Sequence, residues 1–479
     1  MKKTISGVLL ALTAVFALVA CGKKKDNTTK QGGDDKKKGT ISFYVWNDEF
    51  KTRLNELYPE VEKAEASKTT LKNGLVINWV QSPNQSAVYQ NSLDVALSNN
   101  LVDMFCFEAD YATKYVKSDY VADMATLGIN QANQYQYTKD IVTNAAGKLV
   151  GSSWQGTPGI IAYNTTVAKA VWGDSVTLDD MDKKLSKDKA TFDAAAAEVK
   201  AKEKFMNIGT DDWFRVYQNN LSAKMWDGTK VTIDKQLFQW AKDTKEYATK
   251  GYLASTDDTY GLWGGNWGKE MGKNTTLCVF SCPWFTDFCL TGNVKPDVTD
   301  GNYGDLGYKA VKGYQSWFWG GTWLTATKKA ADDANLKDTV ADIITKMTTD
   351  TTILTALAKK YGDFCNDKPA MDALAKSDEG NSALFGGQNV IAIYAASVEK
   401  ADLSKASDYD QQICENFQNA FRGYFQGSKT AEKALDDFIK ALAEATSLAA
   451  KDSADGKVKQ QIFVSDKVTV SGDTITIAA

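Results

Sequence analysis

Histidine is absent from all 479 residues of this chain. The chain therefore lacks the commonest general base and the commonest transition-metal ligand, and no Ser-His-Asp or Cys-His catalytic arrangement can form. Zinc would have to be held by thiolates and carboxylates alone, yet the seven cysteines include no CxxC pair. We expect no metal ion and no other cofactor.

Closely spaced cysteines that could form disulfides are also scarce. Cys278 and Cys282 lie in one expected strand, where four residues span roughly 13 Å, and a disulfide tolerates about 7 Å between Cα atoms. A bridge between Cys282 and Cys289 across a turn stays open, because an extracytoplasmic compartment permits it. We expect most of six cysteines to be buried thiols: Cys106, Cys278, Cys282, Cys289, Cys365 and Cys414.

The N-terminus has the pattern of a lipoprotein signal. Two lysines precede the apolar run at residues 8–20, which ends in Leu18-Val19-Ala20 before Cys21. This run is shorter than the roughly 20 residues that span a bilayer, and small residues before a cysteine mark a cleavage site. We expect residues 1–20 to be removed and Cys21 to carry a diacylglyceryl anchor on the extracytoplasmic face of the cell membrane, as the chain's only membrane contact.

Residues 21–39 contain no apolar residue large enough to form a core and are expected to be a flexible tether. The whole chain has a formal net charge of −4, but residues 1–39 hold nine lysines and three aspartates, which leaves −10 for the body. An acidic body argues against nucleic-acid binding. The remaining 440 residues are more than a single hydrophobic core usually accommodates, so we expect two lobes.

Strand-sized and helix-sized apolar patterns alternate from Thr40 onward, which is typical of βαβ units on a mostly parallel sheet. Ligands of such sheets bind beyond the carboxyl ends of the strands, which directs attention to the polar residues after each run. The alternating runs are residues 41–46, 50–63, 75–80, 87–98 and 102–107, and helical spacing also marks residues 335–349 and 430–445.

Tryptophan is concentrated in one part of the chain, because six of its thirteen copies lie within residues 263–323. Most of the six neighbour glycines, in loops and at strand ends, whereas a core usually fills with leucine, isoleucine and valine on regular periods. Flat aromatic faces accept the C–H face of a sugar ring, while carboxylates and amides bind its hydroxyls. The cluster predicts a carbohydrate-binding surface: Trp263, Trp267, Trp284, Trp317, Trp319 and Trp323.

The chain resembles the family 1, maltose-type extracellular solute-binding proteins of bacterial carbohydrate ABC importers. Five places carry the resemblance: ISFYVWND (41–48), WQGTPGIIAYN (154–164), MGKNTTLCVFSCPWF (271–285), GGTWLTATKKAAD (320–332), and FGGQNV (385–390) with QGSKTAEKALDDF (426–438). The resemblance implies an α/β, two-lobed periplasmic-binding-protein-like fold whose hinge segments close the lobes over a ligand cleft. Residues 40–153 and 324–390 would form the N-terminal lobe and residues 154–323 and 391–450 the C-terminal lobe. Residues 451–479 depart from the family's pattern, and the turn signal Ser471-Gly472-Asp473 predicts a C-terminal hairpin extension there.

The resemblance also implies which residues bind the ligand. The expected set is Asn47, Asp48, Glu49, Glu108, Asp110, Trp154, Gln155, Thr157, Asp212, Trp213, Trp284 and Trp319. Trp284 matches a proline–tryptophan loop that stacks on a sugar ring. Where maltodextrin binders present an aromatic residue near the start of the C-terminal helix, this chain has Asp410-Gln411-Gln412-Ile413-Cys414, so we expect an oligosaccharide other than maltose.

The function implied is a monomeric, non-enzymatic receptor that delivers a sugar or oligosaccharide to the transmembrane subunits of an ABC permease. A secreted glycoside hydrolase would instead use two carboxyl groups as acid and base or nucleophile. The candidate pairs are Asp48 with Glu49 and Glu108 with Asp110. A cell-surface adhesin, or a binder of a non-sugar solute such as a peptide or a polyamine, also stays open, since a polyamine cation would suit an acidic, aromatic cleft.

Overall fold

The computed structural model describes residues 39–450 and 459–478. The expected signal, the anchor residue Cys21 and nearly all of the expected tether lie outside the described residues. Both main sheets and their helices belong to the single unit that contains residues 37–479.

A seven-stranded sheet forms the first half of this unit, in the order β2-β3-β4-β1-β5-β11-β6. Strand β1 runs parallel to β4 and β5, and the other pairings are antiparallel. The sheet is therefore mixed, and the expectation of a mostly parallel sheet was wrong. Its strands are β1 (Thr40–Val45), β2 (Val61–Ala64), β3 (Lys68–Leu71), β4 (Val76–Gln81), β5 (Met104–Glu108), β6 (Ser152–Ser153) and β11 (Thr322–Ala326).

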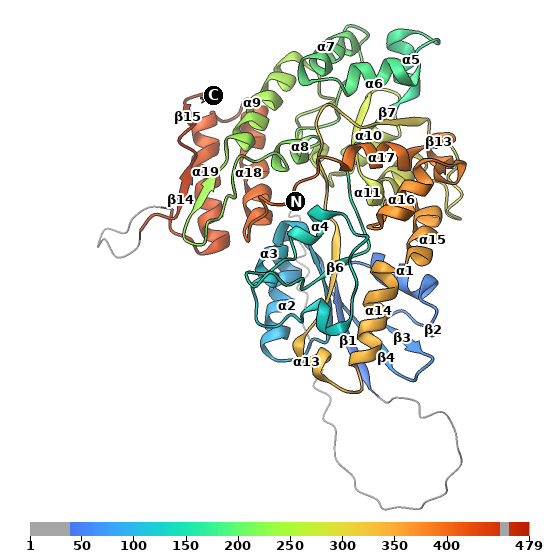
Figure 1. Ribbon diagram of the computed structural model, residues 1–479. Coiled ribbons are helices and arrows are strands. Elements are labelled where there is room, and N and C mark those ends of the chain that lie inside the picture. The colour runs from blue at the N-terminus through green and yellow to red at the C-terminus, as the bar shows by residue number, and fades with distance from the viewer. Residues whose placement is uncertain (1–38, 451–458, 479) are drawn as a thin grey trace, which may run out of the picture. The chain divides into compact units, whose positions relative to one another are not determined.

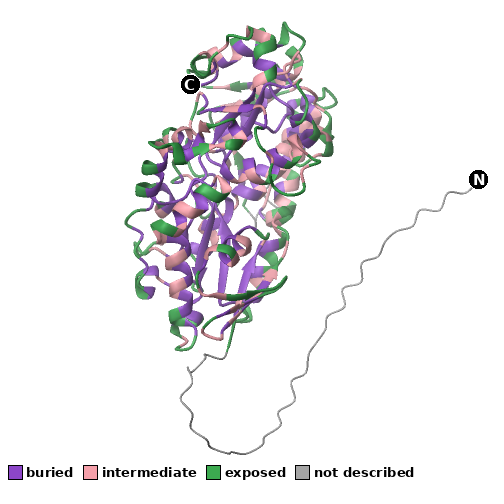
Figure 2. Ribbon diagram, turned by 90° about the vertical axis from the view of Figure 1, so that its right-hand side faces the viewer, coloured by how far each residue is buried: buried purple, intermediate pink, exposed green. Residues whose placement is uncertain are grey.

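Every residue of the central strands β5 and β11 is buried, since helices cover both faces of the sheet (Figures 1 and 2). Continuous apolar strands such as MFCFE are typical of this two-sided burial. The helices that follow these strands in sequence are α1 (Glu49–Leu57), α2 (Val88–Ser98), α3 (Ala112–Val116), α4 (Gln136–Asp140), α13 (Lys328–Asp332), α14 (Lys337–Thr349) and α15 (Thr351–Tyr361).

The first helix is shorter than its apolar pattern predicts. We expected one helical segment over residues 50–63, but α1 ends at Leu57 and residues 61–64 form β2. Tyr58 caps the helix with an extended backbone (φ −76°, ψ 117°). It precedes Pro59, and a residue before proline is sterically pushed out of the helical region.

A three-stranded antiparallel sheet, in the order β10-β7-β9, forms the second half. Its strands are β7 (Ile160–Asn164), β9 (Cys278–Ser281) and β10 (Tyr308–Val311), and β12 (Asn381–Ser382) pairs with β13 (Gln388–Asn389) nearby. The helices of this half are α5 (Thr165–Trp172), α6 (Leu178–Leu185), α7 (Lys189–Lys200), α8 (Phe214–Gln218), α9 (Lys235–Lys250), α10 (Gly265–Met271), α11 (Pro283–Phe285), α12 (Thr291–Val294), α16 (Lys368–Ala375) and α17 (Val390–Val398).

Two long helices, α18 (Asp410–Phe425) and α19 (Ala431–Thr446), pack against each other near the C-terminus (Figure 1). Phe417 of α18 lies between Phe421, whose ring centre is 4.3 Å away, and Phe438 of α19 at 5.1 Å. Beyond them, β14 (Ile462–Val464) pairs in parallel with β8 (Val231–Ile233), and β15 (Val468–Ser471) forms a hairpin with β16 (Thr474–Ile477) around Gly472. The helices expected at residues 335–349 and 430–445 are present as α14 and α19.

The six described cysteines are buried free thiols, so Cys282 and Cys289 do not form the bridge that the sequence left open. Burial raises the pKa of the Cys289 thiol to about 12. In residues 39–450 and 459–478 no group of three His, Cys, Asp or Glu side chains is placed to hold a metal ion. None of the helices in these same ranges has the length and apolar character needed to cross a bilayer.

Candidate ligand-binding cleft

A cavity of about 720 Å³ opens where the ends of β1 and β5 face the loops after β9 and β10 and one side of α18. Trp46 and Asn47 follow β1 directly, Glu108 is the last residue of β5, and Asp110 comes two residues later. The cavity therefore lies beyond the carboxyl ends of two parallel strands, where α/β sheets bind their ligands. Its volume is in the range of small-molecule sites.

Three tryptophan rings form one wall of the cavity: Trp263, Trp284 and Trp319. The rings of Trp263 and Trp284 are close to parallel, with an interplanar angle of 23° and centres 6.3 Å apart. Trp319 stands edge-on to Trp284 at 5.1 Å, and its carbonyl oxygen accepts a 2.8 Å hydrogen bond from Trp284 Nε1. These contacts hold flat apolar faces in fixed positions toward the cavity.

Trp263 is the most exposed ring of the wall, with 53 % of its surface accessible. Its backbone has φ +68°, a left-handed conformation that is an outlier for a bulky residue. The following Gly264 allows this turn, because a Cβ there would meet the Thr259 carbonyl oxygen at 2.2 Å. An exposed tryptophan held in a strained backbone beside a cavity points to a ligand contact.

Two arginines on the cavity wall are each bound by an aspartate. Arg215 of α8 donates two hydrogen bonds to Asp110, at 2.9 and 2.7 Å, and Gln218 adds a third at 3.0 Å. The Arg215 guanidinium also lies 5.5 Å from the centre of the Trp319 ring. Arg422 of α18 donates to Asp211 at 2.9 Å. Both guanidiniums are thus held in place by carboxylates that line the same cavity.

Glu49 and Glu108 bring buried carboxyl groups to the cavity. Burial, with Asp363 nearby, raises the pKa of Glu49 to about 8, although the Arg53 charge lowers it. Gln155 donates to Glu49 Oε1 at 2.7 Å. Burial and the neighbouring Asp110 charge raise the pKa of Glu108 well above its ordinary value, against the opposing effect of Arg215. Protonated, these two groups can donate hydrogen bonds, and ionised they are acceptors only.

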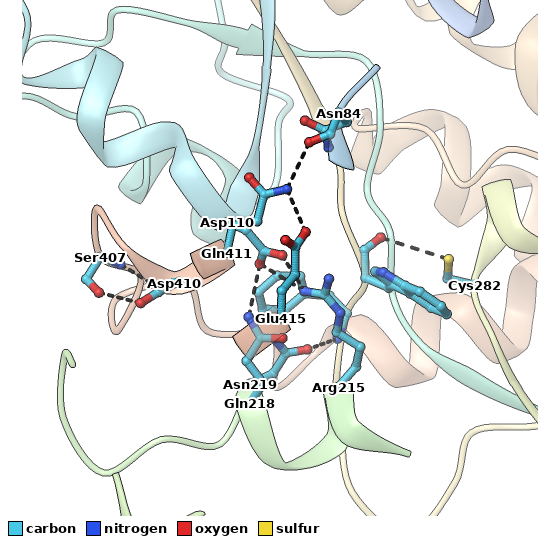
Figure 3. A network of polar contacts seen from close by, with 12 residues as sticks. Asn84, Asp110, Arg215, Gln218, Asn219, Cys282, Ser407, Asp410, Gln411 and Glu415 are labelled. Carbon is cyan, nitrogen blue, oxygen red and sulfur yellow. Dashed lines mark hydrogen bonds and ion pairs between the residues drawn. The ribbon is translucent and has the colours of Figure 1, made fainter. Parts of the chain in front are cut away.

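Helix α18 presents a polar side to the cavity. Its lining residues follow the spacing of one helical face: Gln411, Cys414, Glu415, Gln418, Asn419 and Arg422. Gln411 Nε2 donates to the Asn84 carbonyl oxygen at 3.1 Å and to Glu415 at 3.0 Å, and Figure 3 shows Gln411 between these two partners. The opposite side of α18 is apolar and packs against α9 and α19.

Known proteins with this fold are found by comparing structures and not by comparing sequences. No family model matches the chain, and no curated protein matches it in sequence. A crystal structure described as extracellular solute-binding protein family 1 superimposes with a TM-score of 0.66 at 16 % identity, covering 85 % of this chain and 100 % of its own. The chain has the fold of the two-lobed extracellular solute-binding proteins.

Two further proteins with the solute-binding fold have been determined with sugars bound. The GacH receptor of Streptomyces glaucescens, determined unliganded and with acarbose, matches with a TM-score of 0.61 and 16 % identity over 85 % of this chain and 98 % of its own. The galacto-N-biose/lacto-N-biose I-binding protein of a Bifidobacterium longum ABC transporter, in complex with lacto-N-biose, matches with a TM-score of 0.61 and 10 % identity over 87 % and 98 %.

Within this solute-binding fold, part of the expected ligand-binding set lies together on the cavity wall. These residues come from β5, from the segments that follow β1, β6 and β10, and from α11. They are Asn47, Glu49, Glu108, Asp110, Gln155, Trp284 and Trp319.

The other five expected residues lie outside the cavity lining. Asp48 is exposed and pairs with Lys51 at 2.5 Å. Trp154 and Trp213 are 1 % and 0 % exposed and pack into the core, against Phe50 and Tyr247 respectively. Thr157 is also buried, and Asp212 accepts a hydrogen bond from Trp267 Nε1 at 2.8 Å. In the Asp212 segment it is the preceding residue, Asp211, that reaches the cavity.

Three features of the cavity were not predicted from the sequence: Arg215, Asp211 and the polar side of α18, which includes Arg422. Of these features, only the polar side of α18 could have been predicted from the sequence, because polar residues three and four positions apart form one face of a helix that is apolar on the other face. Arg215 lies on a five-residue helix with no periodicity to reveal it.

Proposed function

We propose that this protein is the substrate-binding component of an ABC importer, which binds a sugar or oligosaccharide in the cavity and delivers it unchanged to a permease. One observation carries the proposal: three tryptophan rings form a wall of a cavity whose other walls hold carboxyl and amide groups. Rings of this kind stack on the C–H faces of sugars, and carboxyl and amide groups bind the hydroxyls. The sugars bound by proteins of the same fold support it.

The proposed mechanism is closure of two lobes, one built on the seven-stranded sheet and the other on the three-stranded sheet. The ligand would contact both, through Glu49, Glu108 and Gln155 on the first side and through the tryptophan wall on the second. The permease would then recognise the closed, loaded protein. The lobe boundaries inferred from the sequence stay a prediction, as does the monomeric state.

The proposed position of the receptor is the outer face of the cell membrane, with the acylated Cys21 as its anchor. Cys21→Ser is expected to block lipid modification, because the sulfur that carries the diacylglyceryl group is gone, and to release the protein from the membrane. Fractionation and mass spectrometry of the mature N-terminus measure both effects. A mature terminus without lipid at another residue would contradict the anchor.

A binding protein returns its ligand intact, so we expect glycan binding without turnover. A thermal-shift screen over a glycan panel, followed by calorimetry, is expected to identify a tight ligand, because a ligand that binds only the folded state raises the melting temperature. Incubation with that glycan should then produce no new reducing ends. New reducing ends that disappear in Glu108→Gln or Asp48→Asn would establish a glycoside hydrolase, and a screen in which no glycan binds would refute the proposed function.

A further inference from the structure

The charges on the cavity wall do not balance. Five carboxyl groups line it, but only two guanidiniums do, and no lysine is among the described lining residues. Arg422 is bound by Asp211 and Arg215 by Asp110. Within the described part of the chain, three glutamates of the wall have no ion-pair partner on it: Glu49, Glu108 and Glu415.

The nearest guanidiniums are engaged elsewhere. Arg53, close to Glu49, forms its ion pairs with Asp287 at 3.0 Å and with Asp363 at 3.4 Å. The Arg215 charge acts on both Glu108 and Glu415, but one nitrogen of its guanidinium already donates to both carboxylate oxygens of Asp110. Figure 3 shows Asp110 joined to Arg215 and the Glu415 carboxylate joined to Gln411. Among the described residues, the ion pair of Arg215 is with Asp110 and not with Glu108 or Glu415.

Three side-chain donors of the wall are already occupied by the protein itself. Gln155 Nε2 donates to Glu49, Gln411 Nε2 donates to Glu415 and to the Asn84 backbone, and Trp284 Nε1 donates to Trp319. Two buried lining atoms have no partner in residues 39–450 and 459–478, the acceptor Asn84 Oδ1 and the donor Arg422 Nε. The wall therefore holds more carboxyl groups than cationic partners for them, and those without a partner become negatively charged acceptors when they ionise.

We propose that the ligand carries a basic nitrogen, as an amino sugar or an oligosaccharide that contains one, and that Glu108 and Glu415 receive its ammonium group. This inference rests on the proposed function and names its ligand class. An ammonium group offers three hydrogen-bond donors and no acceptor, so it is a suitable partner for the carboxyl groups of the wall that have no cation beside them. The tryptophan faces add attraction for a cation within about 6 Å of the ring centre.

The test is calorimetric binding to matched sets of oligosaccharides. Each set keeps ring stereochemistry, linkage and length, and differs at one carbon, which bears a hydroxyl, a free amine or an acetamide. Gluco, galacto and manno series cover the common ring geometries. The amine member of the preferred series is expected to bind about tenfold tighter than the hydroxyl and acetamide members.

Substitutions locate the ammonium group. Glu108→Gln and Glu415→Gln keep the side-chain shape and remove the charge, so each is expected to weaken binding of the amine member about fivefold more than it weakens binding of the hydroxyl member. Glu444→Gln, on the exposed side of α19, is the matched control and should change neither. Because Glu415 is only partly buried, that variant is expected to fold even if the Glu108 variant does not.

The protons released when the ligand binds give an independent test of whether an ammonium group meets these carboxyl groups. Burial and Asp110 hold the pKa of Glu108 high, and burial raises the pKa of Glu415 as well. A bound cation favours the ionised carboxylate, so amine binding should release protons, which calorimetry in two buffers of different ionisation enthalpy detects. Equal or tighter binding of the neutral members, or unchanged amine binding in both variants, would overturn the inference while the proposed function stands. Failure of every carbohydrate would refute the proposed function instead.

Discussion

Trp284→Ala is expected to weaken sugar binding at least tenfold and to leave the fold intact. Trp284 is only partly buried and lines the cavity, so part of its ring is available to the ligand. At about 25 cal/mol per Å² of apolar surface, roughly 60 Å² of ring surface covered by sugar contributes about 1.5 kcal/mol, which is a tenfold change in Kd. Trp319 would also lose the hydrogen bond to its carbonyl oxygen and the edge contact that positions its ring.

The matched control is Trp172→Ala. Trp172 ends α5 and is a partly buried tryptophan outside the cavity lining, so this variant should bind sugar normally. Trp263→Ala is expected to weaken binding as well, because Trp263 is the most exposed ring of the wall. Circular dichroism shows whether each variant is folded, and calorimetry measures its affinity for sugar. Loss of the folded state in Trp284→Ala would make this ring part of the core, and unchanged binding would place the sugar elsewhere.

Asp110→Ala is expected to lower the free energy of unfolding by about 3 kcal/mol, because it leaves the Arg215 guanidinium buried without its counter-ion. The Asp110 and Arg215 side chains are 7 % and 18 % exposed, and Asp110 also accepts from Gln218. Removing one partner of a buried ion pair lowers the free energy of unfolding by more than the intact pair adds to it, because the remaining charge stays buried without compensation. Urea unfolding of the ligand-free protein measures the change.

Two comparisons isolate the cause. Asp179→Ala removes the carboxylate of an exposed ion pair with Lys183 on α6 and is expected to cost less than about 0.5 kcal/mol. Arg215→Met in the Asp110→Ala background removes the orphaned charge, so it should recover part of the lost stability. A double variant no more stable than Asp110→Ala would show that the loss comes from packing around Asp110 and not from the unpaired guanidinium.

Local patterns predicted the frame of this protein well. The strands at residues 40–45, 76–81 and 104–108 and the helices at residues 88–98, 337–349 and 431–446 fall where the apolar spacing placed them, to within a few residues. The rule that ligands bind beyond the carboxyl ends of strands directed attention to Asn47, Glu49, Glu108 and Asp110, all of which line the cavity. The mixed direction of the sheet was missed for two reasons. Strand β11 joins it from more than 200 residues away, and the local antiparallel strands β2 and β3 were not recognised, because residues 50–63 were assigned to one helix.

Composition and local spacing were enough to exclude histidine chemistry, to give the body its acidic net charge, and to place several of the main strands and helices. Which side chains meet was settled by tertiary packing. Trp213 and Trp284 were both expected to contact the ligand, yet one fills the core and the other lines the cavity. Asp110 and Arg215 are 105 residues apart in sequence and form one ion pair. Such contacts depend on how the helices and strands are oriented when they pack, and a local sequence pattern does not specify that orientation.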